Sequence, residues 1–180
     1  DLNHDGVIDS NDQAPIGYNP VPEMTFSLAA GLNWKGIDFS ILLQGAARSS
    51  IYLQQDIAWD NFWGNYYEEH IGRWTPETAA TATYPRFTKA ATAAHPNYYK
   101  SDYWLKDSKY LRLKNIQLGY TIPRKLLKKF GVRSLRVYAN AYNLFTWDNV
   151  KKVDPESSNN SNGQFYPQQK VINFGINLNF

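Results

Sequence analysis

The sequence has no cysteine, which excludes a disulfide framework and any metal site built on thiolates. Its mean hydropathy is -0.54, and no apolar run is long enough to form a transmembrane helix. The formal net charge is only +3, and the cations are scattered apart from a cluster at Lys125–Lys129, so nucleic-acid binding gains little support. A transmembrane barrel is not excluded, because its strands carry apolar side chains only at alternate positions.

Aromatic residues, by contrast, are abundant. They make up 16% of the chain, with 13 Tyr and 6 Trp, which is high for the core of a soluble protein. Two arrangements use aromatic rings in such numbers, namely girdles at membrane interfaces and stacking platforms for ligands.

The last ten residues alternate between apolar and small or polar side chains. Ile172, Phe174, Ile176, Leu178 and Phe180 would share one face of a strand. Soluble strands have about five or six residues, whereas a tilted membrane-spanning strand needs roughly 9–11. The length of this segment therefore favours a bilayer.

Residues 24–46 are predicted to form a β-hairpin. Met24–Trp34 alternates cleanly, Lys35-Gly36 provides a two-residue turn, and apolar residues continue at every second position from Ile37. Residues that flank a two-residue turn lie opposite each other, so Trp34 and Ile37 share a face. The two apolar stripes therefore match in register.

Two later segments are also predicted strands. In Tyr110–Ile122 the apolar residues change phase, which indicates a bulge near Lys114–Asn115. Leu135–Phe145 carries Arg136 on its polar side, and that side is predicted to face a polar lumen, because an Arg facing lipid near the midplane would cost roughly 2–4 kcal/mol. Between them, Arg124–Phe130 is predicted to form one or two helical turns.

The first twelve residues have the spacing of a calcium-binding loop. Oxygen-bearing side chains occupy loop positions 1, 3, 5, 9 and 12, a glycine suited to the sharp turn is at position 6, and position 7 would offer a backbone carbonyl. The alternative is an Asx-rich turn that binds nothing. The predicted calcium ligands are Asp1, Asn3, Asp5, Val7, Asp9 and Asp12.

Residues 47–107 have no sustained strand pattern, and a loop of this length is generally functional. Aromatic residues recur in it at helical spacing from Trp59 to His70, with Gly72 placed to end a short helix. One interpretation is a helix that packs its aromatics onto the loop's own core. The other is a set of surfaces that stack on a sugar or peptide, for which the candidate ligand-binding residues are Trp59, Trp63, Tyr66 and Tyr67.

The connections between the predicted strands alternate in length. Those at 35–36 and 123–134 are short, whereas those at 47–107 and 146–168 are long. Outer-membrane barrels have short turns in the periplasm and long loops outside. The predicted division is a calcium-loop-like extracellular segment over 1–23, a hairpin over 24–46, a long extracellular loop over 47–107 and the last three strands over 108–180.

Several stretches together resemble the C-terminal barrel portion of SusC/RagA-family TonB-dependent outer-membrane transporters, and the resemblance covers essentially the whole chain. The stretches at Tyr110–Pro123 and Asn143–Thr146 are the most specific. The others are Asp1–Asp12 with Ile16-Gly17 and Pro20, Arg73–Glu77, Tyr84–Arg86, Ser101–Leu105, Asp154–Glu156 and the terminal strand.

The resemblance implies an all-β fold, an antiparallel segment of about the last five strands of a 22-stranded transmembrane barrel with long extracellular loops. It also implies import of oligosaccharides or peptides with energy from TonB, a SusD-like lipoprotein as partner, and a location in the outer membrane of a Gram-negative bacterium. The plug and the TonB-contacting segment would lie outside this sequence, so we expect a piece of a longer polypeptide. Phe180 is interpreted as an assembly signal for the terminal strand.

Two other functions are less well supported by the sequence. A soluble β-sandwich that binds carbohydrate beside a dockerin-like calcium loop would have shorter strands and connections of similar length at both ends. A hydrolase is poorly supported by the sequence, because Glu68 and Glu69 are adjacent and no nucleophile–base arrangement stands out. We therefore predict that the chain is not an enzyme.

Overall fold

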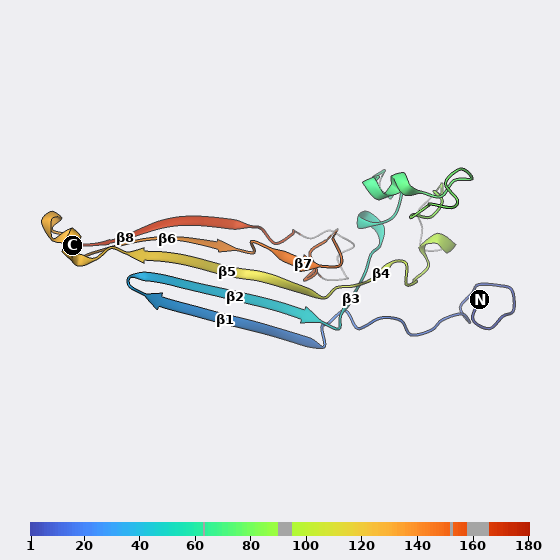
Figure 1. The fold of residues 1–180 in the computed structure, drawn as a ribbon. Coiled ribbons are helices and arrows are strands. Elements are labelled where there is room, and N and C mark those ends of the chain that lie inside the picture. The colour runs from blue at the N-terminus through green and yellow to red at the C-terminus, as the bar shows by residue number, and fades with distance from the viewer. Residues whose placement is uncertain (63, 90–94, 152, 158–165) are drawn as a thin grey trace.

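The structure is a computed structural model that describes residues 1–62, 64–89, 95–151, 153–157 and 166–180. A single antiparallel sheet dominates it (Figure 1). No helix in these residues is long and apolar enough to cross a membrane. The long strands, in their order across the sheet, are β1 (Met24–Trp34), β2 (Ile37–Ala47), β5 (Tyr110–Thr121), β6 (Ser134–Tyr142) and β8 (Val171–Asn179), while β7 (Thr146–Asp148) pairs with β5 beyond the end of β6.

The strands are long enough to cross a bilayer. They contain 11, 11, 12, 9 and 9 residues. At about 3.4 Å per residue, an 11-residue strand is roughly 37 Å long. Tilted by about 45°, it covers roughly 26 Å, close to the apolar band of about 25 Å on outer-membrane barrels.

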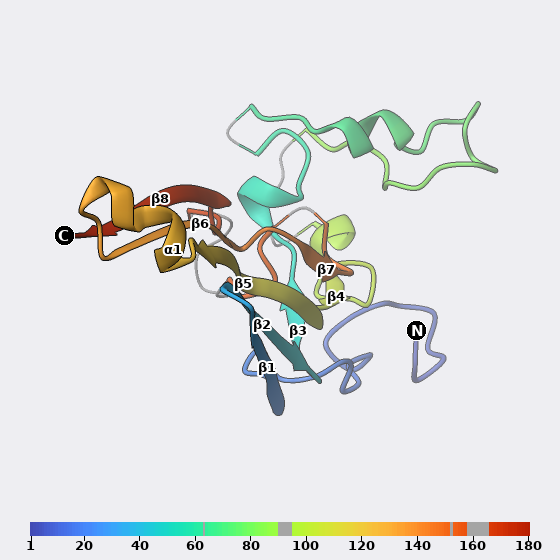
Figure 2. The ribbon, with the colours of Figure 1, turned by 60° about the vertical axis from the view of Figure 1, so that its left-hand side comes forward.

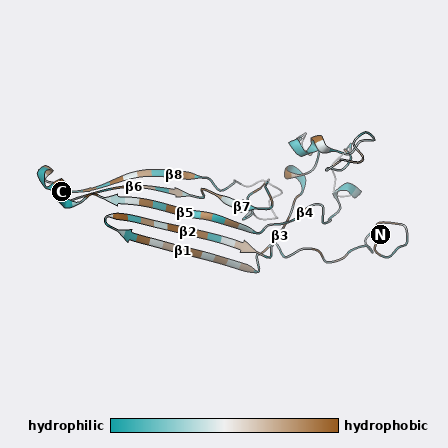
Figure 3. Cartoon of the chain, in the orientation of Figure 1, coloured by the Kyte–Doolittle hydropathy of each residue, from teal (hydrophilic) through white to brown (hydrophobic). Residues whose placement is uncertain are grey.

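The register divides the sheet into an apolar face and a polar face, and the hydropathy alternates along the strands (Figure 3). Across the five long strands, for example, Leu32, Phe39, Leu118, Ala139 and Phe174 lie opposite one another. Side chains directly opposite each other in an antiparallel sheet point to the same side. The apolar side chains of every long strand therefore form one continuous face, defined here as the apolar face.

The predicted bulge and turn are confirmed. The register between β2 and β5 shifts between Leu42, which pairs with Asn115, and Leu43, which pairs with Leu113. Lys114 is the extra residue, and it keeps the apolar residues on one face despite their change of phase. At the β1–β2 turn, Trp34 pairs with Ile37 as predicted.

One end of the sheet carries the short connections. There lie the β1–β2 turn and the segment from β5 to β6, which contains α1 (Arg124–Leu127) and the 3-10 helix η4 (Lys128–Phe130), as predicted for these helical turns (Figure 1). We call this the turn end. The N-terminal segment and the long connections lie at the opposite end, the loop end.

Beyond the loop end stands a lobe, defined as the described residues 50–62, 64–89 and 95–107 (Figure 2). The lobe contains two short paired strands that were not predicted, β3 (Ser50–Tyr52) and β4 (Leu105–Asp107). Its core is largely aromatic. The buried members are Ile51, Leu53, Ala58, Trp59, Tyr84, Tyr98 and Trp104, joined by Val150 from the segment after β7.

The predicted helix from Trp59 to His70 is wrong. The lobe has only the short 3-10 helices η1 (Gln55–Ile57), η2 (Glu68–Gly72) and η3 (Pro96–Tyr98). Asn61 and Gly64 have positive φ angles of 52° and 77°, which a right-handed helix does not allow. The β-sandwich is also wrong, because the described residues form one large sheet and a separate two-stranded one rather than two packed sheets.

Candidate functional site

The polar face carries an ion pair near the turn end. Arg136 on β6 donates hydrogen bonds from Nε and Nη2 to the Asp38 carboxylate on β2, at 2.9 and 2.5 Å. The pair crosses the intervening strand β5 at Gly119, where a Cβ atom would lie 2.5 Å from both side chains. The polar side predicted for Arg136 is therefore confirmed, and glycine at 119 makes room for the bridge.

Similar close packing continues along the polar face. The Tyr138 ring covers Gly175, at which a Cβ atom would lie 2.3 Å from the ring. In the next cross-strand pair on this face, the Asn173 amide donates a hydrogen bond to Asn140 Oδ1 at 2.9 Å. Side chains of neighbouring strands thus interlock across this face, which presents amides, a phenol and a guanidinium.

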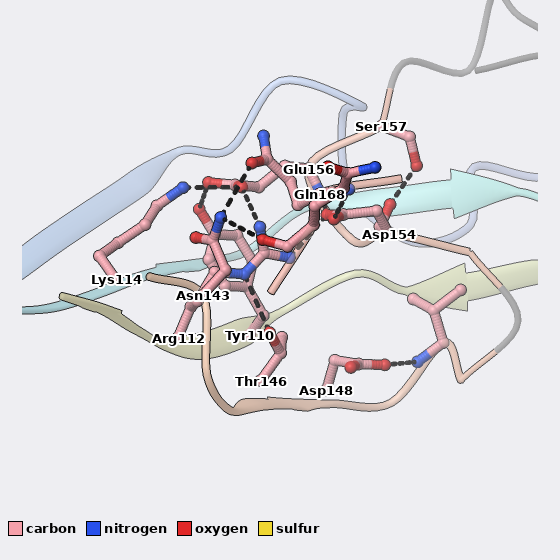
Figure 4. Close-up of polar contacts among 12 residues, drawn as sticks. Tyr110, Arg112, Lys114, Asn143, Thr146, Asp148, Asp154, Glu156, Ser157 and Gln168 are labelled. Atoms are coloured by element: carbon pink, nitrogen blue, oxygen red, sulfur yellow. Dashed lines mark hydrogen bonds and ion pairs between the residues drawn. The ribbon is translucent and has the colours of Figure 1, made fainter. Parts of the chain in front are cut away.

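A second charged cluster lies at the loop end (Figure 4). Arg112 on β5 is 2% exposed, and all three nitrogens of its guanidinium donate hydrogen bonds. Nη2 donates to Asp154 at 2.7 Å, Nη1 to Glu156 at 2.5 Å and Nε to the Thr146 hydroxyl at 2.9 Å. A planar guanidinium with several donors suits such a fork between two carboxylates. Arg112 thereby fastens the segment after β7 to the sheet.

Two further side chains contact the Glu156 carboxylate. The Tyr110 hydroxyl donates to Glu156 Oε1 at 2.6 Å, and Lys114 Nζ contacts Oε2 at 3.0 Å. Lys114 is the bulge residue of β5. The bulge thus adds a second cation beside Glu156, and the cluster holds two cations and two carboxylates.

Asp154 also organises the backbone around it. Its Oδ1 accepts the backbone N–H of Glu156 at 3.0 Å, and its Oδ2 accepts that of Gln168 at 3.2 Å. Burial alone would raise the pKa of Asp154, but the bonds from Arg112 and these amides outweigh burial, so the pKa lies below its usual value. A turn begins at Asp154, since the Ser157 N–H donates to its carbonyl at 2.9 Å.

Two buried polar groups hold the lobe together. The Asp60 carboxylate, 1% exposed, accepts the Tyr98 hydroxyl and the Thr88 N–H. His70, 2% exposed, accepts the Tyr67 N–H on Nδ1 at 3.0 Å, while its Nε2 lies 3.2 Å from the Ala58 carbonyl. Through these hydrogen bonds, Asp60 and His70 join segments of the lobe that lie apart in the sequence.

Three of the four candidate ligand-binding residues are described, and they differ in exposure. Trp59 is 3% exposed and packs against Tyr98 with ring centroids 4.7 Å apart, so it belongs to the lobe's core. Tyr66 and Tyr67 are 56% and 37% exposed and are the members that present surface. Trp63 lies outside the described residues. The ligand contact stays a prediction.

The N-terminal segment folds into a loop closed by its own carboxylates. Asp1 accepts the N–H groups of Asp5 and Gly6 at 3.1 and 2.9 Å, and Asp12 accepts those of Leu2 and Asp9 at 2.6 and 2.8 Å. These bonds, the one from Asp9 foremost, hold the pKa of Asp12 below its usual value.

This donor set fits a hard cation in its chemistry, because it offers carboxylate, amide and carbonyl oxygens. Gly6 has the positive φ of 86° that the sharp turn requires. Within the described residues, however, no group of three or more His, Cys, Asp or Glu side chains converges on a metal position. Calcium binding by the six predicted ligands stays a prediction.

The Arg112 cluster was not predicted from the sequence. The carboxylates come from 42 and 44 residues further along the chain, in a segment predicted only as a long connection. One signal was present, namely an arginine in a strand otherwise rich in apolar residues. Such a residue needs a buried acidic partner or a polar lumen.

Comparison with known proteins gives the chain its relatives. No family model matches it. The TonB-dependent receptor P26 of Formosa agariphila is 30% identical over 197 residues, which cover 100% of this chain and 19% of that protein. The TonB-dependent receptor SusC of Bacteroides thetaiotaomicron is 27% identical over 182 residues, which cover 100% of this chain and 17% of that protein. The chain thus spans about a fifth of the length of these relatives.

Solved structures show the same fold. The RagAB peptide importer in its open-open state matches with a TM-score of 0.68 and 22% identity, over 97% of this chain and 19% of that chain. Its closed-closed state matches with a TM-score of 0.65. The alignment over the full chain and the match in fold agree, and the chain is similar to part of the SusC/RagA-type TonB-dependent receptors, which are outer-membrane proteins of Gram-negative bacteria.

Proposed function

We propose that the sheet is part of the wall of a transmembrane barrel, with its apolar face toward lipid and its polar face toward the lumen. The observation that carries this proposal is the unbroken apolar face across five strands of membrane-spanning length. The edges at β1 and β8 are open in this chain, and open edges are not tolerated in lipid. Further strands of the whole receptor would pair with them, to a total of 22.

The short and long connections support one orientation of the sheet in the membrane. The turn end would face the periplasm and the loop end the exterior, as in other outer-membrane barrels. The lobe and the Arg112 cluster would then stand at the outer mouth. The polar face, with its interlocked side chains, would line the lumen beside the plug.

The whole receptor would import oligosaccharides or peptides with energy delivered through TonB and with a SusD-like lipoprotein as partner. The names of two relatives support this, since one is SusC and another is a peptide importer. Within this chain, Tyr66 and Tyr67 would offer exposed rings to a substrate or to the partner. No enzymatic step is proposed.

Calcium would bind the N-terminal loop through the oxygens of Asp1, Asn3, Asp5, Asp9 and Asp12 and the Val7 carbonyl. The ion would supply charge neutralisation and a fixed loop conformation rather than chemistry. The sharp turn at Gly6 and the hard oxygen donors support this proposal. Phe180, 76% exposed after β8, stays a predicted assembly signal.

Growth of a strain that lacks the receptor gene tests import. On either a panel of oligosaccharides or a tryptic digest of casein as sole carbon source, we expect slower growth that the complete gene restores. Restoration by a Tyr66→Ala, Tyr67→Ala double variant should be partial, whereas a Tyr166→Ala variant is the control. Wild-type growth of the deletion strain on every source would contradict import of these two substrate classes.

A further inference from the structure

An apolar groove crosses the apolar face close to the turn end. Its volume is about 460 Å³, within the range of roughly 300–1,000 Å³ typical of small-molecule sites. The small side chain of Ala139 contributes to its lining, and larger apolar side chains surround it. These are Ile37, Leu118, Tyr120, Val137 and Phe174.

The nearest connection at this end is strongly cationic. From Ile122 to Leu135 the chain has five cations and no acidic residue. All five are exposed, and in the described residues none forms an ion pair. Asp38, on the neighbouring strand β2, is engaged by Arg136 on the opposite face. The five cations are Arg124, Lys125, Lys128, Lys129 and Arg133.

The same connection exposes two large apolar side chains. Leu126 is 65% exposed and Phe130 is 76% exposed, and they alternate with the lysines. Apolar side chains interleaved with cations are typical of segments that lie at a membrane interface. The connection would therefore meet the headgroup region rather than bulk water.

The groove and the cations are close enough for one lipid molecule to reach both. Tyr120 lines the groove, and Arg124 follows four residues later, so the two are at most roughly 13 Å apart along the chain. An apolar groove accepts a hydrocarbon chain, and a cluster of unpaired cations accepts a phosphate.

We propose that the turn end binds an anionic glycerophospholipid, with an acyl chain in the groove and its phosphate at Lys125, Lys128 and Lys129. The lipid would come from the periplasmic leaflet, because the short connections place this end there. The site depends on the orientation of the wall and not on what the receptor imports.

Native mass spectrometry of the full-length receptor in detergent tests the proposal. We expect phosphatidylglycerol to be retained more tightly than phosphatidylethanolamine. Each cation near an anionic surface strengthens binding about fivefold, so the combined K125Q, K128Q and K129Q variant should lose roughly a hundredfold in affinity for phosphatidylglycerol. Ala139→Phe, which fills the groove, should weaken retention of both lipids.

Matched controls separate this site from general lipid contact. Three other lysines, changed together as K89Q, K100Q and K109Q, remove the same charge near the loop end, and Ala30→Phe adds the same ring elsewhere on the apolar face. Neither should alter lipid retention. Equal retention of both lipids by the wild type, or an unchanged preference in the triple variant, would overturn the proposal. So would tighter retention of lipopolysaccharide, because that lipid belongs to the opposite leaflet.

Discussion

Replacement of Arg112 by methionine should release the segment around Asp154 from the sheet. Methionine keeps much of the side chain's length but removes the guanidinium, which leaves two carboxylates without their main partner. Removal of one partner from a buried ion pair costs about 3–5 kcal/mol. Asp154 and Glu156 retain 9% and 21% exposure, and Lys114 still reaches Glu156 at 3.0 Å. We therefore expect a smaller cost of about 2–3 kcal/mol.

Hydrogen exchange of the full-length receptor measures this cost locally. The amides of Glu156 and Ser157 should exchange about 30- to 150-fold faster in Arg112→Met, since each 1.4 kcal/mol changes a local opening equilibrium tenfold. Lys114→Met is the matched control, because its pair is partly exposed and is expected to contribute less than about 1 kcal/mol. Exchange within threefold of the wild type in Arg112→Met would refute the reasoning.

The same measurement has a defined pH dependence. The pKa of Asp154 is lower in the folded chain than its reference value of 3.8. The carboxylate therefore stabilises the folded state fully above that value, and the stabilisation is lost as the pH falls through the lower, folded-state pKa. Exchange at Glu156 and Ser157, corrected for its intrinsic rate, should be constant from pH 7 to about 5 and accelerate below about 4. Among the groups that lower the pKa of Asp154, Arg112 contributes most, so the acceleration at low pH should be weaker in Arg112→Met.

Three further outcomes are expected. Gly119→Ala should displace the ion pair between β2 and β6 and lower the free energy of unfolding, measured by thermal melting, by about 1–3 kcal/mol. Gly31→Ala should cost less in the same measurement, because a Cβ atom there meets only ordinary contact at 3.5 Å. Equal costs would contradict this account. His70→Phe leaves a buried N–H and a buried carbonyl without partners, and each loss costs about 1–3 kcal/mol. Limited proteolysis should therefore cut the lobe faster. Unchanged cleavage would argue against a structural role for His70. Calcium in excess should slow exchange in residues 1–12 of the wild type but not of Asp12→Ala, and no slowing in the wild type would exclude the ion.

The sheet was predictable because its signals are local. The hairpin follows from alternation on either side of Lys35-Gly36, and the bulge follows from a change of phase within a single strand. Each of these signals lies within about a dozen residues. Periodicity alone therefore identified the five long strands, although not the three residues of β7, which continue the pairing with β5 after a break.

The loop end was less predictable because its contacts are distant in sequence. The Arg112 cluster joins residues more than 40 positions apart, and the pairing of β3 with β4 closes a loop of over 50 residues. The aromatic spacing after Trp59 matched a helix, but positive φ angles at Asn61 and Gly64 prevent one. The rings serve the lobe's core instead, so spacing alone did not distinguish core from ligand surface.

The burial of Val150 in the lobe has a consequence for how the loop end can move. Val150 comes from the segment after β7, yet it is 5% exposed within a core built from the segment between β2 and β5. The lobe cannot separate from Val150 without exposing apolar side chains of this shared core, so the two are expected to open together. Any motion of the lobe would then also pull on the segment after β7, which Arg112 joins to the sheet.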